Sequence, residues 1–110
     1  MQKILFICSQ NKLRSPTAEQ VFSQTPELEV LSAGTNNDAE NPVTPELIQW
    51  ADKILVMEKM HVDKIRTKFK RILKNQKIIC LGIPDNYKYM DPELIKILMA
   101  KVPKLLNLTS

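Results

Sequence analysis

Two residues near the start of the chain, Cys8 and Arg14, are separated by five residues and are followed directly by Ser15 and Pro16. A segment of this length can curl into a ring whose backbone N–H groups point at one anion. A thiolate is a strong nucleophile, and the planar guanidinium of arginine can bind two oxygens of a phosphoryl group. These residue types at this spacing indicate chemistry on a phosphate dianion.

The residues predicted to bind the phosphate follow Cys8 without interruption: Ser9, Gln10, Asn11, Lys12, Leu13, Arg14 and Ser15. The N–H groups of the ring and the start of a helix would favour the thiolate of Cys8 over the thiol. Ser15 could donate a hydrogen bond to the sulfur. Asn11 tolerates the left-handed backbone that a tight loop without glycine requires, so we expect its role to be structural.

The segments on either side predict how this loop is positioned. Residues 2–7 are almost continuously apolar, as in a central strand that is covered on both faces. Pro16 lacks an N–H and is expected at the first position of a short helix that continues over residues 17–24. Each feature alone has an ordinary structural explanation, but together they place the loop at the carboxyl end of a strand, where open α/β sheets bind ligands.

The segment CSQNKLRSP, followed by SAGT at residues 32–35, resembles the low-molecular-weight protein tyrosine phosphatases. The resemblance implies an α/β fold of three layers, flavodoxin-like, with a four-stranded parallel sheet. It also implies a hydrolase that works through a cysteinyl-phosphate, without a metal or a cofactor, on a phosphotyrosine protein or a small aryl phosphate. Ser32, the serine of SAGT, would support the phosphate loop from behind.

Two positions of the loop depart from the usual pattern of this family. Gln10 stands where glycine is usual, and Leu13 stands where a second cysteine is usual. The larger Gln10 leaves open a protein that binds phosphate but turns it over poorly. The absence of the second cysteine removes the usual disulfide partner of the nucleophile but should not prevent turnover. The segment between SAGT and the next strand is also shorter than is usual, which affects the wall around the site.

Further strands are expected over residues 29–32, 53–57 and 77–83, and further helices over residues 45–51, 61–73 and 92–102. Gly34 would supply the turn freedom that ends the second strand. We expect Cys80 to pack in the core as a small hydrophobic residue. In the last helix, Ile95 and Met99 would share the buried face with three other apolar residues.

The helix expected from His61 onward exposes a basic face. This face could bind RNA or an acidic partner, but no aromatic residues are interleaved with the charges, so a solvated face is the favoured interpretation and we do not expect a nucleic-acid partner. His61 is the single histidine of the chain. A metal-binding or base role would need partners nearby in sequence, and we therefore interpret it as a helix-start residue.

Two aspartates compete for the role of general acid, which would protonate the leaving oxygen. Asp85 and Tyr87 match the family's Asp-Pro-Tyr segment in position but lack its proline. Asp91-Pro92 matches the dipeptide but stands elsewhere, and an aspartate before proline and glutamate is typical of a helix N-cap. We favour Asp85. Tyr87 and Tyr89 could flank an aromatic substrate ring or could simply be loop residues.

The composition predicts one domain over residues 1–110, since the chain is long enough for one core and 44% of it is hydrophobic. Two cysteines do not suggest a disulfide framework, and neither a signal peptide nor a membrane-spanning run is recognisable. We therefore expect a cytoplasmic protein without a membrane partner. The net charge of +4 favours anionic substrates.

Two other functions remain open beside the phosphatase. An arsenate reductase could use the same scaffold, but the related reductases use further redox cysteines in a mobile segment, and only Cys80 is available here. A non-catalytic module could use the loop to recognise a phosphorylated partner. The combination of Cys8, Arg14 and a candidate acid favours the enzyme.

Overall fold

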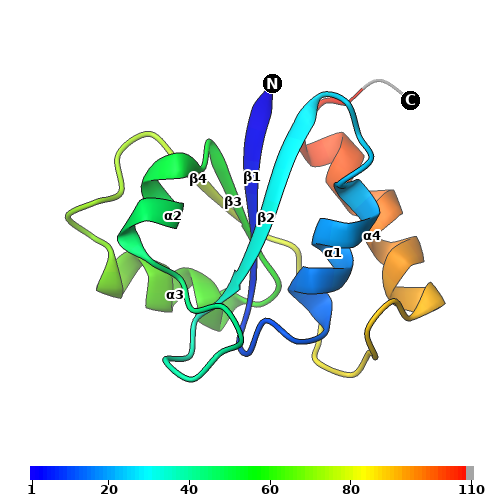
Figure 1. The fold of residues 1–110 in the computed structure, drawn as a ribbon, viewed down its shortest axis with the longest axis horizontal. Coiled ribbons are helices and arrows are strands. Elements are labelled where there is room, and N and C mark those ends of the chain that lie inside the picture. Colours follow the sequence, from blue (N-terminus) through cyan, green and yellow to red (C-terminus); the bar gives the residue numbers. More distant parts are fainter. Residues whose placement is uncertain (109–110) are drawn as a thin grey trace.

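Four strands and four helices alternate along the chain in a computed structural model that describes residues 1–108 (Figure 1). The strands are β1 (Gln2–Cys8), β2 (Leu28–Gly34), β3 (Lys53–Val56) and β4 (Lys77–Cys80). The helices are α1 (Arg14–Phe22), α2 (Pro45–Trp50), α3 (Lys59–Lys68) and α4 (Pro92–Leu105). The expected order of strands and helices is confirmed.

The sheet has the strand order β2-β1-β3-β4, and all of its strand pairs are parallel. Helices α1 and α4 cover one face and α2 and α3 cover the other, as Figure 1 shows on either side of the strands. The fold is therefore the expected α/β domain type, three layers deep and flavodoxin-like. All strands point the same way, so their carboxyl ends share one edge of the sheet.

The central strand β1 is buried on both faces because successive side chains of a strand point in opposite directions. Ile4 and Phe6 pack in the core that contains α1 and α4, and Leu5 and Ile7 pack in the core that contains α2 and α3. The ring of Phe6 stacks on that of Phe22 in α1 at a centroid distance of 5.8 Å. Complete burial of such side chains contributes roughly 1.5–3 kcal/mol each, which fixes the strand that ends at Cys8.

The ends of two helices differ from the expectation. Helix α1 begins at Arg14, so Pro16 is its third residue and not its first. The first four N–H groups of any helix lack partners within it, so a proline is tolerated there as well. Helix α3 ends at Lys68, yet Phe69 is buried and Leu73 packs on the same core. The apolar stripe continues through a turn, and such a stripe alone does not reveal where the helix stops.

The expected buried face of α4 was too wide. Leu94, Leu98 and Val102 are buried at intervals of four residues, whereas Met99 is 53% exposed and Ile95 only partly buried. The helix contacts a single layer, so only a narrow stripe is covered. Pro103 does not end this helix, which continues to Leu105.

The turn freedom predicted for Gly34 is not the reason why glycine stands at this position. Of the two glycines in the chain, it is Gly82 that has a positive φ, of 68°. A Cβ atom on Gly34 would lie 2.5 Å from the carbonyl oxygen of Ser9 and 2.6 Å from the Cβ atom of Ala39. Glycine is needed here because the loop after β1 packs directly against the end of β2.

The predicted burial of Cys80 was also wrong. Cys80 ends β4, the edge strand of the sheet, and its side chain is exposed. The neighbouring Ile78 and Ile79 pack partly against the two cores, one on each face. An edge strand is covered less completely than a central one, so an apolar run does not guarantee burial at its ends.

Candidate active site

The loop between β1 and α1 lies at the carboxyl edge of the sheet, against the segment that follows β2. The backbone N–H groups of Thr35, Asn36 and Glu40 donate to the carbonyl oxygens of Cys8, Ser9 and Gln10 at 2.9, 3.0 and 2.9 Å. These three hydrogen bonds attach the loop, through its carbonyl groups, to the segment after β2. The neighbouring segment thereby fixes the shape of the loop in which the predicted phosphate-binding residues lie.

The sulfur of Cys8 has two hydrogen-bonding neighbours in and next to the loop. Cys8 is buried, with 3% of its surface exposed. The backbone N–H of Asn11 donates to the sulfur at 3.2 Å, and the Ser15 hydroxyl oxygen lies 3.0 Å from it. Asn11 has φ of 56°, in the left-handed region, which turns its N–H inward. Both groups can therefore donate a hydrogen bond to the sulfur.

The side chain of Asn11 links the loop to β2. Its amide donates to the hydroxyl oxygens of Ser15 and Ser32, both at 2.9 Å. The Ser15 oxygen therefore accepts from Asn11, and its own proton can be donated to the sulfur of Cys8, at 3.0 Å, or to the carbonyl oxygen of Ala33, at 3.4 Å. Ser32 in turn donates to the carboxylate of Glu19 in α1. The sequence predicted supporting roles for Asn11 and Ser32 but did not single out Glu19, whose position on a partly exposed helix carries no signal.

Arg14 is almost completely buried, at 2% exposure, and its guanidinium has three partners. Its Nη1 donates to the carbonyl of Ile83 at 2.8 Å and lies 3.4 Å from a carboxylate oxygen of Glu58, while its Nε lies 3.7 Å from a carboxylate oxygen of Asp85. A buried cation needs such partners to offset its desolvation. They also hold the guanidinium in one position.

Glu58 was missed by the sequence reasoning. It comes two residues after the end of β3, at the carboxyl edge of the sheet, and its side chain is 30% exposed. An acid immediately after a buried strand, at the edge where ligands bind, was a usable signal.

A small cavity opens over the sulfur. Its volume is about 180 Å³, and it is lined by Cys8, Ser9, Gln10, Lys12, Leu13, Arg14 and Asp85. The structure thus brings Cys8, Arg14 and one of the two candidate acids to one cavity.

The second candidate acid, Asp91, does not line this cavity. It is the N-cap of α4, where its carboxylate accepts from the backbone N–H of Glu93 at 3.0 Å. The two tyrosines do not line it either: Tyr87 packs partly against the core and Tyr89 is 51% exposed.

His61 contacts the loop, which the sequence reasoning did not foresee. It lies in the first turn of α3, as expected, but it is fully buried. Its Nε2 lies 2.9 Å from the hydroxyl oxygen of Ser9, and its Nδ1 accepts from the backbone N–H of Glu58 at 3.0 Å. Burial first, and then the positive charge of Arg14, lower the pKa of His61 from 6.5 to about 4. The ring is therefore neutral at neutral pH.

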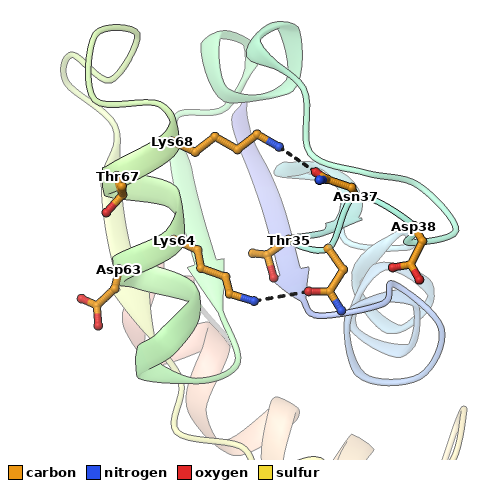
Figure 2. Close-up of a pocket in the computed structure, with 8 residues that line it drawn as sticks. Thr35, Asn37, Asp38, Asp63, Lys64, Thr67 and Lys68 are labelled. Atoms are coloured by element: carbon orange, nitrogen blue, oxygen red, sulfur yellow. Dashed lines mark hydrogen bonds between the residues drawn. The ribbon is translucent and has the colours of Figure 1, made fainter.

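A larger and shallower hollow of about 700 Å³ lies beside the cavity, between α3 and the segment after β2. Figure 2 shows Lys64 and Lys68 of α3 reaching across it to the amide oxygens of Asn36 and Asn37, at 3.3 and 3.2 Å. None of Cys8, Arg14 and Asp85 lines this hollow. Lys64 and Lys68 belong to the basic face of α3, and through these hydrogen bonds they support the segment that holds the loop.

Within residues 1–108, no group of three or more His, Cys, Asp or Glu residues could hold a metal ion. Within the same residues no helix combines the length and the apolar character that a membrane crossing requires.

Comparison with known proteins shows similarity to one family of phosphatases. A sequence profile described as "Low molecular weight phosphotyrosine protein phosphatase" matches residues 3–53. No curated protein sequence matches the chain significantly. Among solved structures, Wzb from Vibrio vulnificus in complex with benzylphosphonate is 26% identical, with a TM-score of 0.74, over 94% of this chain and 98% of that one.

Two further structures are each 24% identical over 97% of this chain and have a TM-score of 0.76. They are the YwlE arginine phosphatase from Geobacillus stearothermophilus, of which the match covers 94%, and the tyrosine phosphatase AmsI from Erwinia amylovora, of which it covers 93%. Similarity at this level supports the fold, and the profile and the Wzb match add the sequence relationship. Residues 3–53 thus match the low molecular weight phosphotyrosine protein phosphatase family, and the profile and the structures together indicate a cysteine-dependent phosphatase.

Proposed function

We propose that the protein hydrolyses phosphotyrosine in proteins, or a small aryl phosphate, with Cys8 as nucleophile, Arg14 as phosphate ligand and Asp85 as general acid. The observation that carries this assignment is the single cavity that all three residues line. Of the two aspartates that competed in the sequence, only Asp85 lines it, and Asp91 already has a structural role as a helix cap.

In the first step the thiolate of Cys8 forms a bond to phosphorus, the bond from phosphorus to the tyrosine oxygen breaks, and protonated Asp85 gives its proton to that oxygen. In the second step the Asp85 carboxylate takes a proton from water, the water oxygen bonds to phosphorus, and the sulfur leaves as thiolate. Arg14 binds two of the phosphoryl oxygens throughout. The buried contacts of its guanidinium prepare this geometry before the substrate arrives.

Lys12 supports a tyrosine substrate over an arginine substrate. The leaving group of a phosphoarginine becomes a cationic guanidinium, whereas the phenol of tyrosine is neutral. Lys12 is exposed and lines the cavity, so its charge would repel the cation at the point where it leaves. Benzylphosphonate, the ligand bound to Wzb, carries an aromatic ring next to its phosphonate, in keeping with an aryl substrate.

The test is the rate constant kcat/KM for two peptides of the same sequence, one with phosphotyrosine and one with phosphoarginine. We expect the phosphotyrosine peptide to be preferred at least tenfold, which corresponds to about 1.4 kcal/mol. Preference for phosphoarginine would contradict the assignment. Binding of vanadate without hydrolysis of either peptide or of an aryl phosphate would favour the non-catalytic module instead.

The proposal extends to the organisation and location of the protein. We propose that residues 1–110 form one domain, because both cores pack on the same sheet. A nucleophilic thiol needs a compartment that keeps thiols reduced, and neither Cys8 nor Cys80 is in a disulfide. The cytoplasm fits this requirement.

Replacing Cys80 with serine should leave aryl phosphate hydrolysis within about twofold of the unmodified protein and change the unfolding free energy by less than about 0.5 kcal/mol. The reason is that Cys80 is exposed on an edge strand and does not line the cavity of Cys8. Enzyme assays and urea unfolding measure the two effects. Thiol-dependent arsenate reduction that disappears in this variant would revive the arsenate reductase, which the family relationship does not favour.

A further inference from the structure

The hydrogen bonds of His61 determine which of its ring nitrogens carries the proton. The backbone N–H of Glu58 can only donate, so Nδ1, 3.0 Å away, accepts and bears no proton. A neutral ring then has its proton on Nε2. That proton is donated to the hydroxyl oxygen of Ser9, which lies 2.9 Å from Nε2.

The surroundings of the ring keep it neutral. His61 is fully buried in the first turn of α3. The charged groups that act on it are Arg14, Glu58, Lys64 and Asp85. The two cations oppose protonation and the two carboxylates favour it, and burial adds to the effect of the cations. An imidazolium would also lose the bond from Glu58, because both of its nitrogens would be donors.

This tautomer has a consequence for Ser9. The Ser9 oxygen accepts from His61, so its own hydroxyl proton is directed elsewhere. Within residues 1–108, the Ser9 side chain makes no other hydrogen bond, and it lines the cavity over Cys8. A phosphoryl oxygen bound in that cavity would supply the missing acceptor.

The turn of residues 58–61 also contacts Arg14, the other hydrogen-bond donor that lines the cavity. Glu58 presents its N–H to His61 and its carboxylate to Arg14, at 3.4 Å. Residues 58–61 therefore contact, from the end of β3, both a hydroxyl and a guanidinium that line the cavity. A displacement of this turn would move both donors.

We propose that His61 is a positioning residue of the phosphatase, which holds the Ser9 oxygen from outside the loop and thereby directs the Ser9 hydroxyl at the bound phosphoryl group. The proposal rests on the proposed function, since it assigns a further donor to the same cavity. It assigns no proton transfer to His61, which does not line the cavity and stays neutral.

The tautomer can be measured directly, because His61 is the single histidine of the chain. Long-range ¹H–¹⁵N NMR correlations of the unmodified protein should show a protonated Nε2 and an unprotonated Nδ1, without titration of the ring between pH 8 and pH 5. A protonated Nδ1, or titration close to pH 6.5, would overturn the proposal. This measurement does not depend on turnover.

The coupling between His61 and Ser9 requires a double-mutant cycle. Ser9→Ala and His61→Phe should each weaken the binding of inorganic phosphate about three- to tenfold, which is the range expected for one hydrogen bond. The double variant should bind phosphate no more weakly than the single variant that has the lower affinity. His61→Gln retains an amide donor and should recover most of the affinity. Additive losses, or equal losses for His61→Phe and His61→Gln, would show that His61 acts only through packing.

Phosphate affinity and turnover separate this inference from the proposed function. If the cycle shows coupling but the unmodified protein hydrolyses no aryl phosphate, the enzyme assignment fails and the positioning role stands as a binding feature. If hydrolysis occurs but phosphate affinity is unchanged in Ser9→Ala, the positioning role fails alone. If His61→Phe does not fold, the phosphate affinity of Ser9→Ala and the NMR measurement of the His61 tautomer still test the positioning role.

Discussion

A Cys8→Ser variant should lose multiple-turnover hydrolysis of aryl phosphates by at least about 10⁴-fold, or roughly 5 kcal/mol of activation free energy, while it still binds phosphate. A thiolate is the attacking form of a cysteine, whereas a serine hydroxyl is not ionised near neutrality and is a much weaker nucleophile. The loop itself should keep its shape, because its outer carbonyl groups are held by the segment after β2. Turnover and phosphate affinity are therefore expected to separate.

Steady-state assays give the first quantity, and titration with phosphate or vanadate gives the second. Cys80→Ser is the matched control, since it removes the other thiol of the chain and should be close to neutral. Residual activity of Cys8→Ser within tenfold of the unmodified protein would contradict a covalent intermediate on Cys8. Loss of phosphate binding together with activity would point to a collapsed loop.

Features that depend on local chemistry were predictable. The N-cap of α2 is Thr44, with Pro45 directly after it, and the hydroxyl oxygen of Thr44 accepts from the N–H of Leu47 at 3.2 Å. The left-handed backbone of Asn11 and the burial of β1 follow from the same kind of reasoning. In each case the residue type and its immediate neighbours were sufficient to predict the conformation.

The contacts that the sequence did not reveal depend on the order of strands in the sheet. Glu58 and His61 are 44 and 52 residues away from the loop residues that they touch, Arg14 and Ser9. They meet because β3 lies next to β1, so both strands end side by side at one edge. A charge pattern or a helical period carries no information about this neighbour relationship.

The strand order also explains the error on Cys80. The apolar run of β4 resembles that of β1, but β4 lies at the edge of the sheet and β1 at its centre. Hydrophobicity predicts that a segment is a strand more reliably than it predicts how completely the strand is covered. The role of Gly34 was misjudged for a related reason, because a close approach between a loop and the end of a strand leaves no signature in either segment.

An Asp85→Asn variant should slow phosphotyrosine hydrolysis by about 10² to 10⁴-fold, since asparagine cannot give a proton to the phenol oxygen. Asp85 is suited to the role because its side chain is 63% exposed, close enough to Arg14 to be positioned, at 3.7 Å, yet open to exchange protons with water. The loss should be much smaller for an aryl phosphate whose leaving group is acidic enough to depart without a proton. Rate constants across a series of leaving groups of different pKa measure this dependence.

Asp91→Asn provides the control in the same loop region. Asparagine caps a helix about as well as aspartate, so the bond to the N–H of Glu93 should survive, and the side chain does not line the cavity. Its rate constants should follow those of the unmodified protein for every leaving group. A leaving-group-dependent loss in Asp91→Asn, with none in Asp85→Asn, would assign the acid to the residue before Pro92. It would also require the segment from residue 85 to residue 91 to move toward Cys8 when a substrate binds.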